Sequence, residues 1–145
     1  MVSLNHIGIS VANLERSIAF YVAAFGMTVV SNTTFASEKY DRKYGAILGL
    51  NDAAGVVAIL EGSGLRLELF QFDRPLSKRT DGARPVCDHG ITHFCLQVND
   101  IDAAYARLLR VGATFHCPPQ RVGHSAATYG RDPDANVFEL LQVCA

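Results

Sequence analysis

Two histidines and two glutamates occupy matching places in two similar stretches of the chain. His6 and His93 each open an alternating apolar stretch and lie 87 residues apart, while Glu68 and Glu139 each interrupt an apolar stretch late in their half. An ionised carboxylate in apolar surroundings is costly unless it is paired or binds a cation. Two imidazoles and two carboxylates that meet would form a mixed nitrogen and oxygen site for one divalent ion, such as Zn, Ni, Co, Mn or Fe.

Each polar side chain, taken alone, also has a purely structural explanation. A glutamate in an apolar strand can be a rim carboxylate that pairs with an arginine, and Arg66 is close enough in sequence to serve Glu68. His116 and His124 flank a Pro-Pro loop and are more typical of surface or packing residues, and Arg131 lies in a turn where it is either solvated or available to an anionic substrate group. Only the repetition of the set favours a metal site.

Periodicity predicts the elements that position these residues. In the first half we expect strands at about residues 4–11, 27–34, 56–61 and 65–72. Asn13 is suited to cap a helix and Gly26 to end it, because glycine tolerates positive φ. The apolar positions of this helix are Leu14, Ile18, Tyr21, Val22 and Phe25. Residues 38–50 predict a short extra helix from the spacing of Tyr40, Tyr44, Ile47 and Leu48.

The second half repeats this plan after a long connecting loop at residues 73–90, whose Arg74, Lys78, Arg79 and Arg84 could attract a carboxylate or phosphate. We expect strands at 91–98, 113–117, 125–130 and 137–143, and a turn rich in Asp and Asn at 131–136. Asp100 should cap the helix and Gly112 close it. Its expected buried stripe is Ile101, Ala104, Tyr105, Leu108 and Leu109.

Aligning the halves predicts an internal repeat. With the histidines superposed, Leu14 meets Ile101. At the other end of each half, residues 67–71 separately match residues 138–142 in residue type. Each half is then a strand, a helix and further strands. The fold class is α+β, and residues 1–145 form one domain of two βαβββ modules, module one at about 1–72 and module two at about 91–145.

Composition narrows the function classes. The chain has 145 residues, 49% of them hydrophobic and 19% charged, with a formal net charge of −1, which gives no electrostatic argument for nucleic acid. No apolar run is long enough to span a membrane and no signal-peptide pattern opens the sequence, so we expect a cytoplasmic protein. The cysteines, which form no CxxC pair, are then expected to be reduced: Cys87, Cys95, Cys117 and Cys144.

The sequence resembles the vicinal oxygen chelate superfamily, which includes glyoxalase I, methylmalonyl-CoA epimerase, extradiol dioxygenases, fosfomycin-resistance transferases and bleomycin-resistance proteins. The resemblance covers nearly the whole chain and rests on residues 6–11, 67–70, 90–94 and 132–140. It implies paired modules that form a cupped, incompletely closed barrel around one metal, often in a homodimer.

The resemblance also implies roles for the four residues. Glyoxalase I and methylmalonyl-CoA epimerase use ligands in the order His, Glu or Gln, His, Glu, which His6, Glu68, His93 and Glu139 match. It implies a metal-dependent lyase, isomerase or epimerase that abstracts a proton next to a carbonyl, with the metal stabilising an enediolate. Glu139 is the first candidate for the base and Glu68 the second.

Two other functions remain open from sequence. An Fe(II) extradiol-type dioxygenase would need open coordination positions for O₂, with Glu68 off the metal. A non-catalytic drug or metabolite binding protein would need no metal at all. Residue types do not select among a glutathione hemithioacetal, an acyl-CoA and a sugar-like or polyketide ketone as the carbonyl substrate.

Overall fold

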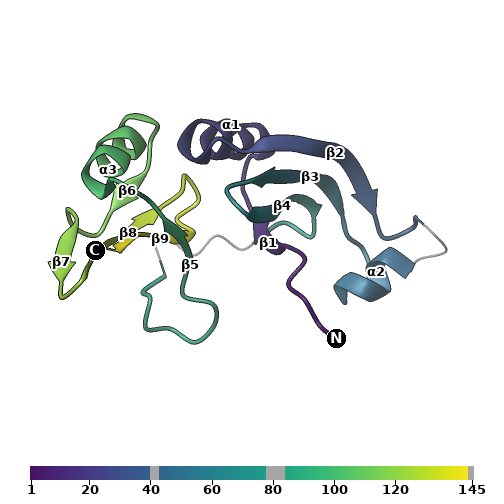
Figure 1. The fold of residues 1–145 in the computed structure, drawn as a ribbon. Coiled ribbons are helices and arrows are strands. Elements are labelled where there is room, and N and C mark those ends of the chain that lie inside the picture. The colour runs from purple at the N-terminus through teal and green to yellow at the C-terminus, as the bar shows by residue number, and fades with distance from the viewer. Residues whose placement is uncertain (40–42, 78–83, 144–145) are drawn as a thin grey trace. The chain divides into compact units, whose positions relative to one another are not determined.

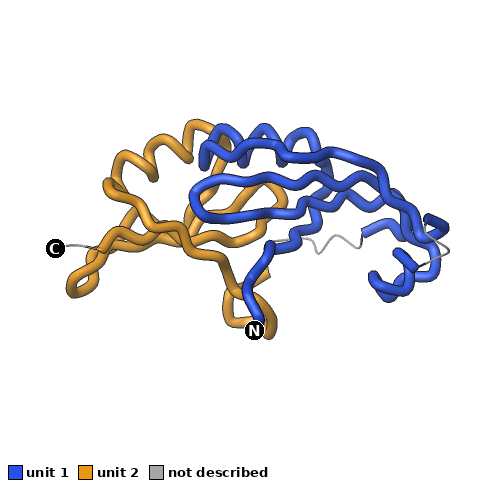
Figure 2. The backbone as a smooth tube through the Cα atoms, turned by 45° about the vertical axis from the view of Figure 1, so that its right-hand side comes forward, with its two compact units in different colours: residues 1–79 blue, residues 80–145 orange. Residues whose placement is uncertain are grey.

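The computed structural model describes residues 1–39, 43–77 and 84–143. The chain forms two compact units, Met1–Arg79 and Thr80–Ala145 (Figure 2). Each unit has its own sheet and its own long helix (Figure 1). No helix among the described residues has the length and apolar character needed to cross a membrane.

The first unit is a βαβββ module with one added helix. Its elements are β1 (Ile7–Ser10), α1 (Leu14–Phe25), β2 (Thr28–Ala36), α2 (Lys43–Leu48), β3 (Ala54–Gly62) and β4 (Leu65–Arg74). The sheet order is β1-β4-β3-β2, and β1 runs parallel to β4 while the other pairs are antiparallel. The expected extra helix is therefore present as α2, although Tyr40 lies outside the described residues.

The second unit repeats this topology. Its elements are β5 (Phe94–Gln97), α3 (Ile101–Arg110), β6 (Thr114–Phe115), β7 (Gln120–Val122), β8 (Ser125–Arg131) and β9 (Val137–Val143). The sheet order is β5-β9-β8-β6, with β7 paired to β8, and β5 runs parallel to β9. The prediction of an α+β fold with two βαβββ modules is confirmed.

The repeat extends to the strand register. In the first unit Ile7 pairs with Leu67, and in the second Phe94 pairs with Phe138. The comparison of the two halves matches Ile7 with Phe94 and Leu67 with Phe138, so the two strand pairs are equivalent. Each first strand therefore meets its last strand at the same point. This fixes each glutamate one residue further along, beside Gly8 in one unit and Cys95 in the other.

A glutamine on each last strand holds the start of each helix. Gln71 Oε1 accepts a hydrogen bond from the Leu14 N–H at 2.8 Å, and Gln142 Oε1 accepts one from the Ile101 N–H at 2.9 Å. The first turn of a helix has N–H groups without partners inside the helix, so these bonds satisfy a donor that would otherwise need water. They also tie the glutamate-bearing strand to the helix in both units.

Asn13, Gly26 and Asp100 cap their helices as predicted, whereas the C-cap of α3 is Val111, with Gly112 following at a positive φ, and the buried helix faces also differ. Asn13 and Asp100 accept from the third residue of their helices, and Gly26 ends α1 at a φ of 65°. Val22 and Leu109, expected in the buried stripes, are 41% and 45% exposed. The buried positions of α1 are Leu14, Ser17, Phe20, Tyr21 and Ala24. Small residues such as serine and alanine lie on the closely packed face, and a prediction based only on hydrophobic side chains does not identify them.

Candidate metal centre

The first unit brings His6 and Glu68 together. His6 Nε2 lies 3.1 Å from Glu68 Oε2, and the side chains are 42% and 22% exposed. His6 Nδ1 lies 2.9 Å from Asn5 Oδ1. Because an amide oxygen only accepts, Nδ1 carries a proton. Nε2 is therefore the ring atom that faces the Glu68 carboxylate.

The second unit contains the equivalent pair. His93 Nε2 lies 3.0 Å from Glu139 Oε2, and these side chains are 23% and 17% exposed. His93 Nδ1 is hydrogen-bonded to Thr92 Oγ1 at 2.9 Å. In both units the residue before the histidine therefore orients the ring, and Nε2 faces the glutamate.

Each histidine stands one residue before its strand. The strands β1 and β5 begin at Ile7 and Phe94, so the strands expected at 4–11 and 91–98 are shorter than predicted. Ile91, expected inside a strand, is 80% exposed. The backbone at His6 and His93 is thus released from the sheet just where the side chain must reach across to the last strand.

The four candidate residues form two pairs in the structure, one in each unit. Among the described residues no group of three or more His, Cys, Asp or Glu side chains is gathered as a metal site. Two ligand atoms at about 2.1 Å from one ion and at right angles to each other lie about 3.0 Å apart. The spacing within each pair therefore suits two adjacent ligands of a divalent ion.

Two residues beside Glu139 were not assigned a role from sequence. Glu139 on β9 pairs with Tyr129 on β8 and with Cys95 on β5. Partial burial raises the pKa of the Cys95 thiol to about 11, and a hydrogen bond to Glu139 and the charge of that carboxylate act in the same direction. Burial and the Glu139 charge also raise the pKa of Tyr129. Tyr129 could have been identified by predicting that β8 pairs with β9 in a register that places Tyr129 opposite Glu139.

The structural alternative, in which Arg66 pairs with Glu68, is not the arrangement in the structure. Arg66 Nε lies 3.0 Å from Glu61 Oε1, because Arg66 and Glu61 face each other across β4 and β3. Successive residues in a strand point to opposite faces of the sheet, so Arg66 and Glu68, two residues apart, lie on the same face. Arg66 nevertheless pairs with Glu61, because the residue directly opposite on the neighbouring strand is closer than Glu68. Glu68 is left to His6.

The other basic candidates mostly hold loops. Arg131 Nε donates to His116 Nε2 at 3.0 Å, and its Nη1 and Nη2 donate to the carbonyls of Ala135 and Arg84. Arg84 donates to the carbonyls of Asp88, His89 and Ile91, so it folds its own loop. These bonds favour structural roles over capture of an anionic substrate.

The remaining basic candidates have simpler outcomes. Arg74 pairs with Asp52 and Glu38, and His124 is exposed beside β7. Lys78 and Arg79, like Cys144, lie outside the described residues.

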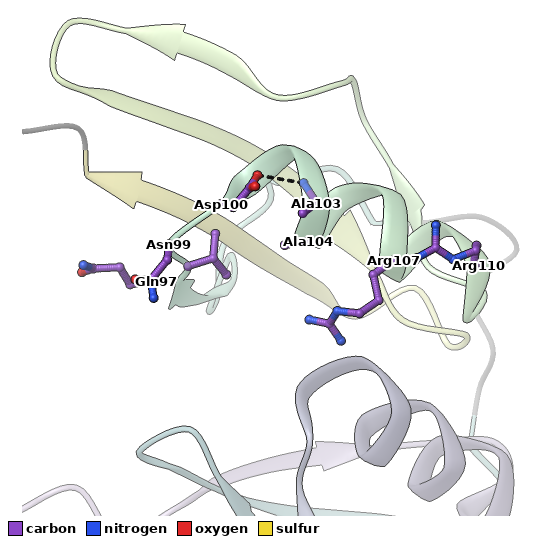
Figure 3. Close-up of a pocket in the computed structure, with 8 residues that line it drawn as sticks. Gln97, Asn99, Asp100, Ala103, Ala104, Arg107 and Arg110 are labelled. Atoms are coloured by element: carbon purple, nitrogen blue, oxygen red, sulfur yellow. Dashed lines mark hydrogen bonds between the residues drawn. The ribbon is translucent and has the colours of Figure 1, made fainter.

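An open pocket of about 570 Å³ lies on the second unit, at the end of β5 and along α3 (Figure 3). It is lined by Gln97, Val98, Asn99, Asp100, Ala103, Ala104, Arg107 and Arg110. The figure shows the Asp100 carboxylate accepting from the Ala103 N–H, the cap of α3. Because none of the four candidate ligands lines this pocket, we do not place the metal centre there.

Comparisons with known proteins agree with the fold. The model of the Glyoxalase/Bleomycin resistance protein/Dioxygenase superfamily matches residues 3–140. A putative lactoylglutathione lyase of Brassica oleracea var. gemmifera is 28% identical over 139 residues, which cover 94% of this chain and 43% of that protein. The chain thus spans less than half the length of that relative.

Two solved structures show the same fold. A glyoxalase family protein of Bacillus cereus has a TM-score of 0.86 at 20% identity, covering 100% of this chain and 96% of that one. A fosfomycin resistance protein of Listeria monocytogenes, complexed with Mn(II) and sulfate, has a TM-score of 0.61 at 18% identity, covering 98% and 93%. With the family model covering nearly all of its residues, the chain belongs to the Glyoxalase/Bleomycin resistance protein/Dioxygenase superfamily.

Proposed function

We propose that this protein is a metal-dependent lyase, isomerase or epimerase that abstracts a proton next to a carbonyl and proceeds through an enediolate. The observation that carries the proposal is the duplicated pair: His6 with Glu68 at 3.1 Å and His93 with Glu139 at 3.0 Å, at equivalent positions of two modules. The lactoylglutathione lyase named among its relatives supports the lyase class.

We further propose that the four side chains together hold one divalent ion. Two imidazole nitrogens and two carboxylates suit Zn, Ni, Co, Mn or Fe, and the spacing within each pair suits adjacent ligands of one ion. When bound, such an ion supplies a Lewis acid that stabilises negative charge developing on substrate oxygens. The proposed substrate is a small carbonyl compound.

The chain's own residues supply the orientation of these ligands. Asn5 and Thr92 fix the Nδ1 side of each imidazole, so Nε2 is directed to the glutamate before any ligand arrives. Partners of this kind raise metal affinity because the ring does not have to be ordered at the moment of binding. Both histidines are prepared in this way.

Glu139 is the proposed base and Glu68 the second candidate. Glu139 is 17% exposed, so its side chain is largely shielded from water. It would return the proton to the same carbon in an epimerisation or to the neighbouring carbon in an isomerisation. A carboxylate that binds a cation is a weaker base, so a base role for Glu139 would require partial detachment from the ion.

Deuterium exchange tests the proposal. Protein loaded with Zn, Ni or Co would be incubated in D₂O with a glutathione hemithioacetal and, separately, with a 2-methyl-branched acyl-CoA, and proton loss next to the carbonyl followed by NMR. We expect metal-dependent exchange with one of them, which a chelator stops. Glu139→Gln should keep the metal and lower the rate by about 100-fold or more, the usual contribution of a general base.

Other results would replace the proposal. Full exchange by Glu139→Gln with its metal in place would remove Glu139 as the base. Oxygen uptake with a catechol would favour the dioxygenase. Tight binding of a small molecule by metal-free protein, without exchange, would favour a binding protein.

A further inference from the structure

The two His–Glu pairs have different neighbours. Residues directly paired across a sheet place their side chains on the same face. In the second unit the row across β5, β9 and β8 is Cys95, Glu139 and Tyr129. In the first unit the equivalent row across β1, β4 and β3 is Gly8, Glu68 and Ile59. A thiol and a phenol ring therefore flank Glu139 where a hydrogen and an aliphatic chain flank Glu68.

The phenol ring contacts the histidine of its pair. The ring centroids of Tyr129 and His93 are 4.6 Å apart at an interplanar angle of 42°. This is at the close end of the range for packed aromatic rings, 4.5–7 Å. His93 therefore contacts Thr92 through Nδ1, Glu139 through Nε2 and Tyr129 through its ring.

The equivalent histidine has a looser environment. His6 is held at Nδ1 and Nε2 in the same way, but the aromatic contacts of the described residues include none with its ring. Its side chain is 42% exposed, against 23% for His93. The extra contact thus accompanies the more shielded imidazole.

We propose that Tyr129 is a positioning residue, whose ring fixes the imidazole of His93 so that the second unit offers the better ordered half of the metal site. The inference rests on the proposed function, because it assigns His93 to that site. A phenol ring suits this role because a tyrosine side chain has only two rotatable torsions and its backbone is held in β8. It acts through van der Waals contact with the imidazole, so phenylalanine should serve nearly as well.

The test uses Co²⁺ alone as the probe, with absorption spectra and titration calorimetry on the full chain. Tyr129→Phe should bind Co²⁺ within about twofold of the unchanged protein and keep its spectrum. Tyr129→Ile, which installs the residue of the first unit, should weaken Co²⁺ binding by about tenfold or more and alter the spectrum, as loss of an outer partner does. If that variant fails to fold, Tyr129→Leu takes its place.

Tyr105→Ile is the matched control. Tyr105 packs on Phe115 with the same centroid distance of 4.6 Å, in the same unit, but contacts no candidate ligand in that ring pair. It should lose thermal stability to a similar degree and bind Co²⁺ as the unchanged protein does. A general loosening of the unit would instead weaken binding in both variants and would overturn the positioning role.

A second measurement keeps the two proposals distinguishable. In metal-free protein, the imidazole ¹⁵N resonances of His93 should report one ordered ring in the unchanged protein and in Tyr129→Phe, and an averaged ring in Tyr129→Ile. If the unchanged protein bound no Co²⁺, the metal site would fail while this measurement still decided the role of Tyr129. Equal Co²⁺ affinity and equal spectra in Tyr129→Ile would reject the positioning role alone.

Discussion

At the scale of single residues, the two glutamates have similar geometry and unequal surroundings. Glu139 lies between Cys95 and Tyr129, and Glu68 between Gly8 and Ile59. Cys95 and Tyr129 are the register partners of Glu139 on the two strands beside β9, and the Glu139 charge raises the pKa of both side chains. The same residue type in the two halves is therefore expected to differ in function.

Replacing each glutamate by glutamine should separate a ligand from a base. Glutamine keeps an oxygen that can bind a metal but loses the basic carboxylate. We expect Glu68→Gln to retain the metal and at least about a tenth of the exchange rate, and Glu139→Gln to fall by about 100-fold. Metal content and deuterium exchange, measured on both proteins, check this. Equal losses would show that the glutamates share one role.

Gly130 must be a glycine because two aromatic rings occupy the space where a side chain would lie. A Cβ there would lie 2.4 Å from the ring of Phe138 and 2.8 Å from that of Phe115. Gly130→Ala should lower the free energy of unfolding by about 1–3 kcal/mol, since both rings are packed and must shift. Gly8→Ala is the control, because a Cβ there meets nothing within 4 Å. Urea unfolding of both variants gives the comparison, and equal midpoints would contradict the packing argument.

At the scale of elements, the last strand of each unit does two tasks. It carries the glutamate and, three residues later, the glutamine that binds the first N–H of the helix. The helix start, the strand and the carboxylate are thus set by one register. A shift of the strand by one residue would move the glutamate to the opposite face and leave the helix N–H without its acceptor.

Removing the glutamine acceptor should destabilise each unit. Gln142→Ala and Gln71→Ala should each cost about 1 kcal/mol, the usual cost of losing a cap of this kind. Gln97→Ala, at an exposed position of β5, should change stability by less than about 0.5 kcal/mol. Chemical unfolding checks all three. If Gln97→Ala cost as much as Gln142→Ala, the helix contact would not be the cause.

At the scale of the whole molecule, the proposal that both pairs share one ion has a distinctive consequence. An ion that binds the folded chain at 100 times its dissociation constant adds about 2.7 kcal/mol to the free energy of unfolding. We expect one Co²⁺ or Zn²⁺ per chain, and we expect either His6→Ala or His93→Ala to remove most of this stabilisation. Calorimetry and thermal unfolding with and without a chelator provide the measurements.

The contrary outcome is also defined. Two ions per chain, with each histidine variant losing only one of them, would mean that the pairs act as separate sites. The proposal of one four-ligand centre would then be abandoned, while the membership of the family would stand on its own evidence.

Much of the fold followed from the sequence because local patterns carry it. Alternation and helical spacing predicted β9 at residues 137–143 and the caps Asn13 and Asp100, and all three are present. The repeat predicted which positions of the two halves correspond, and the strand registers follow that correspondence. Local periodicity determines such features because they depend on residues near in sequence.

Contacts between strands were decided only by the tertiary structure. Arg66 pairs with Glu61 rather than Glu68, and Tyr129 reaches His93, because partners across a sheet depend on register and on which strands are neighbours. The sequence by itself determined that each half carries a histidine and a glutamate at corresponding positions. Only the tertiary structure brings each histidine within about 3 Å of its glutamate and lets the preceding residue orient the imidazole. The reason is that the first and last strands of each unit, which are far apart in the chain, pair in parallel.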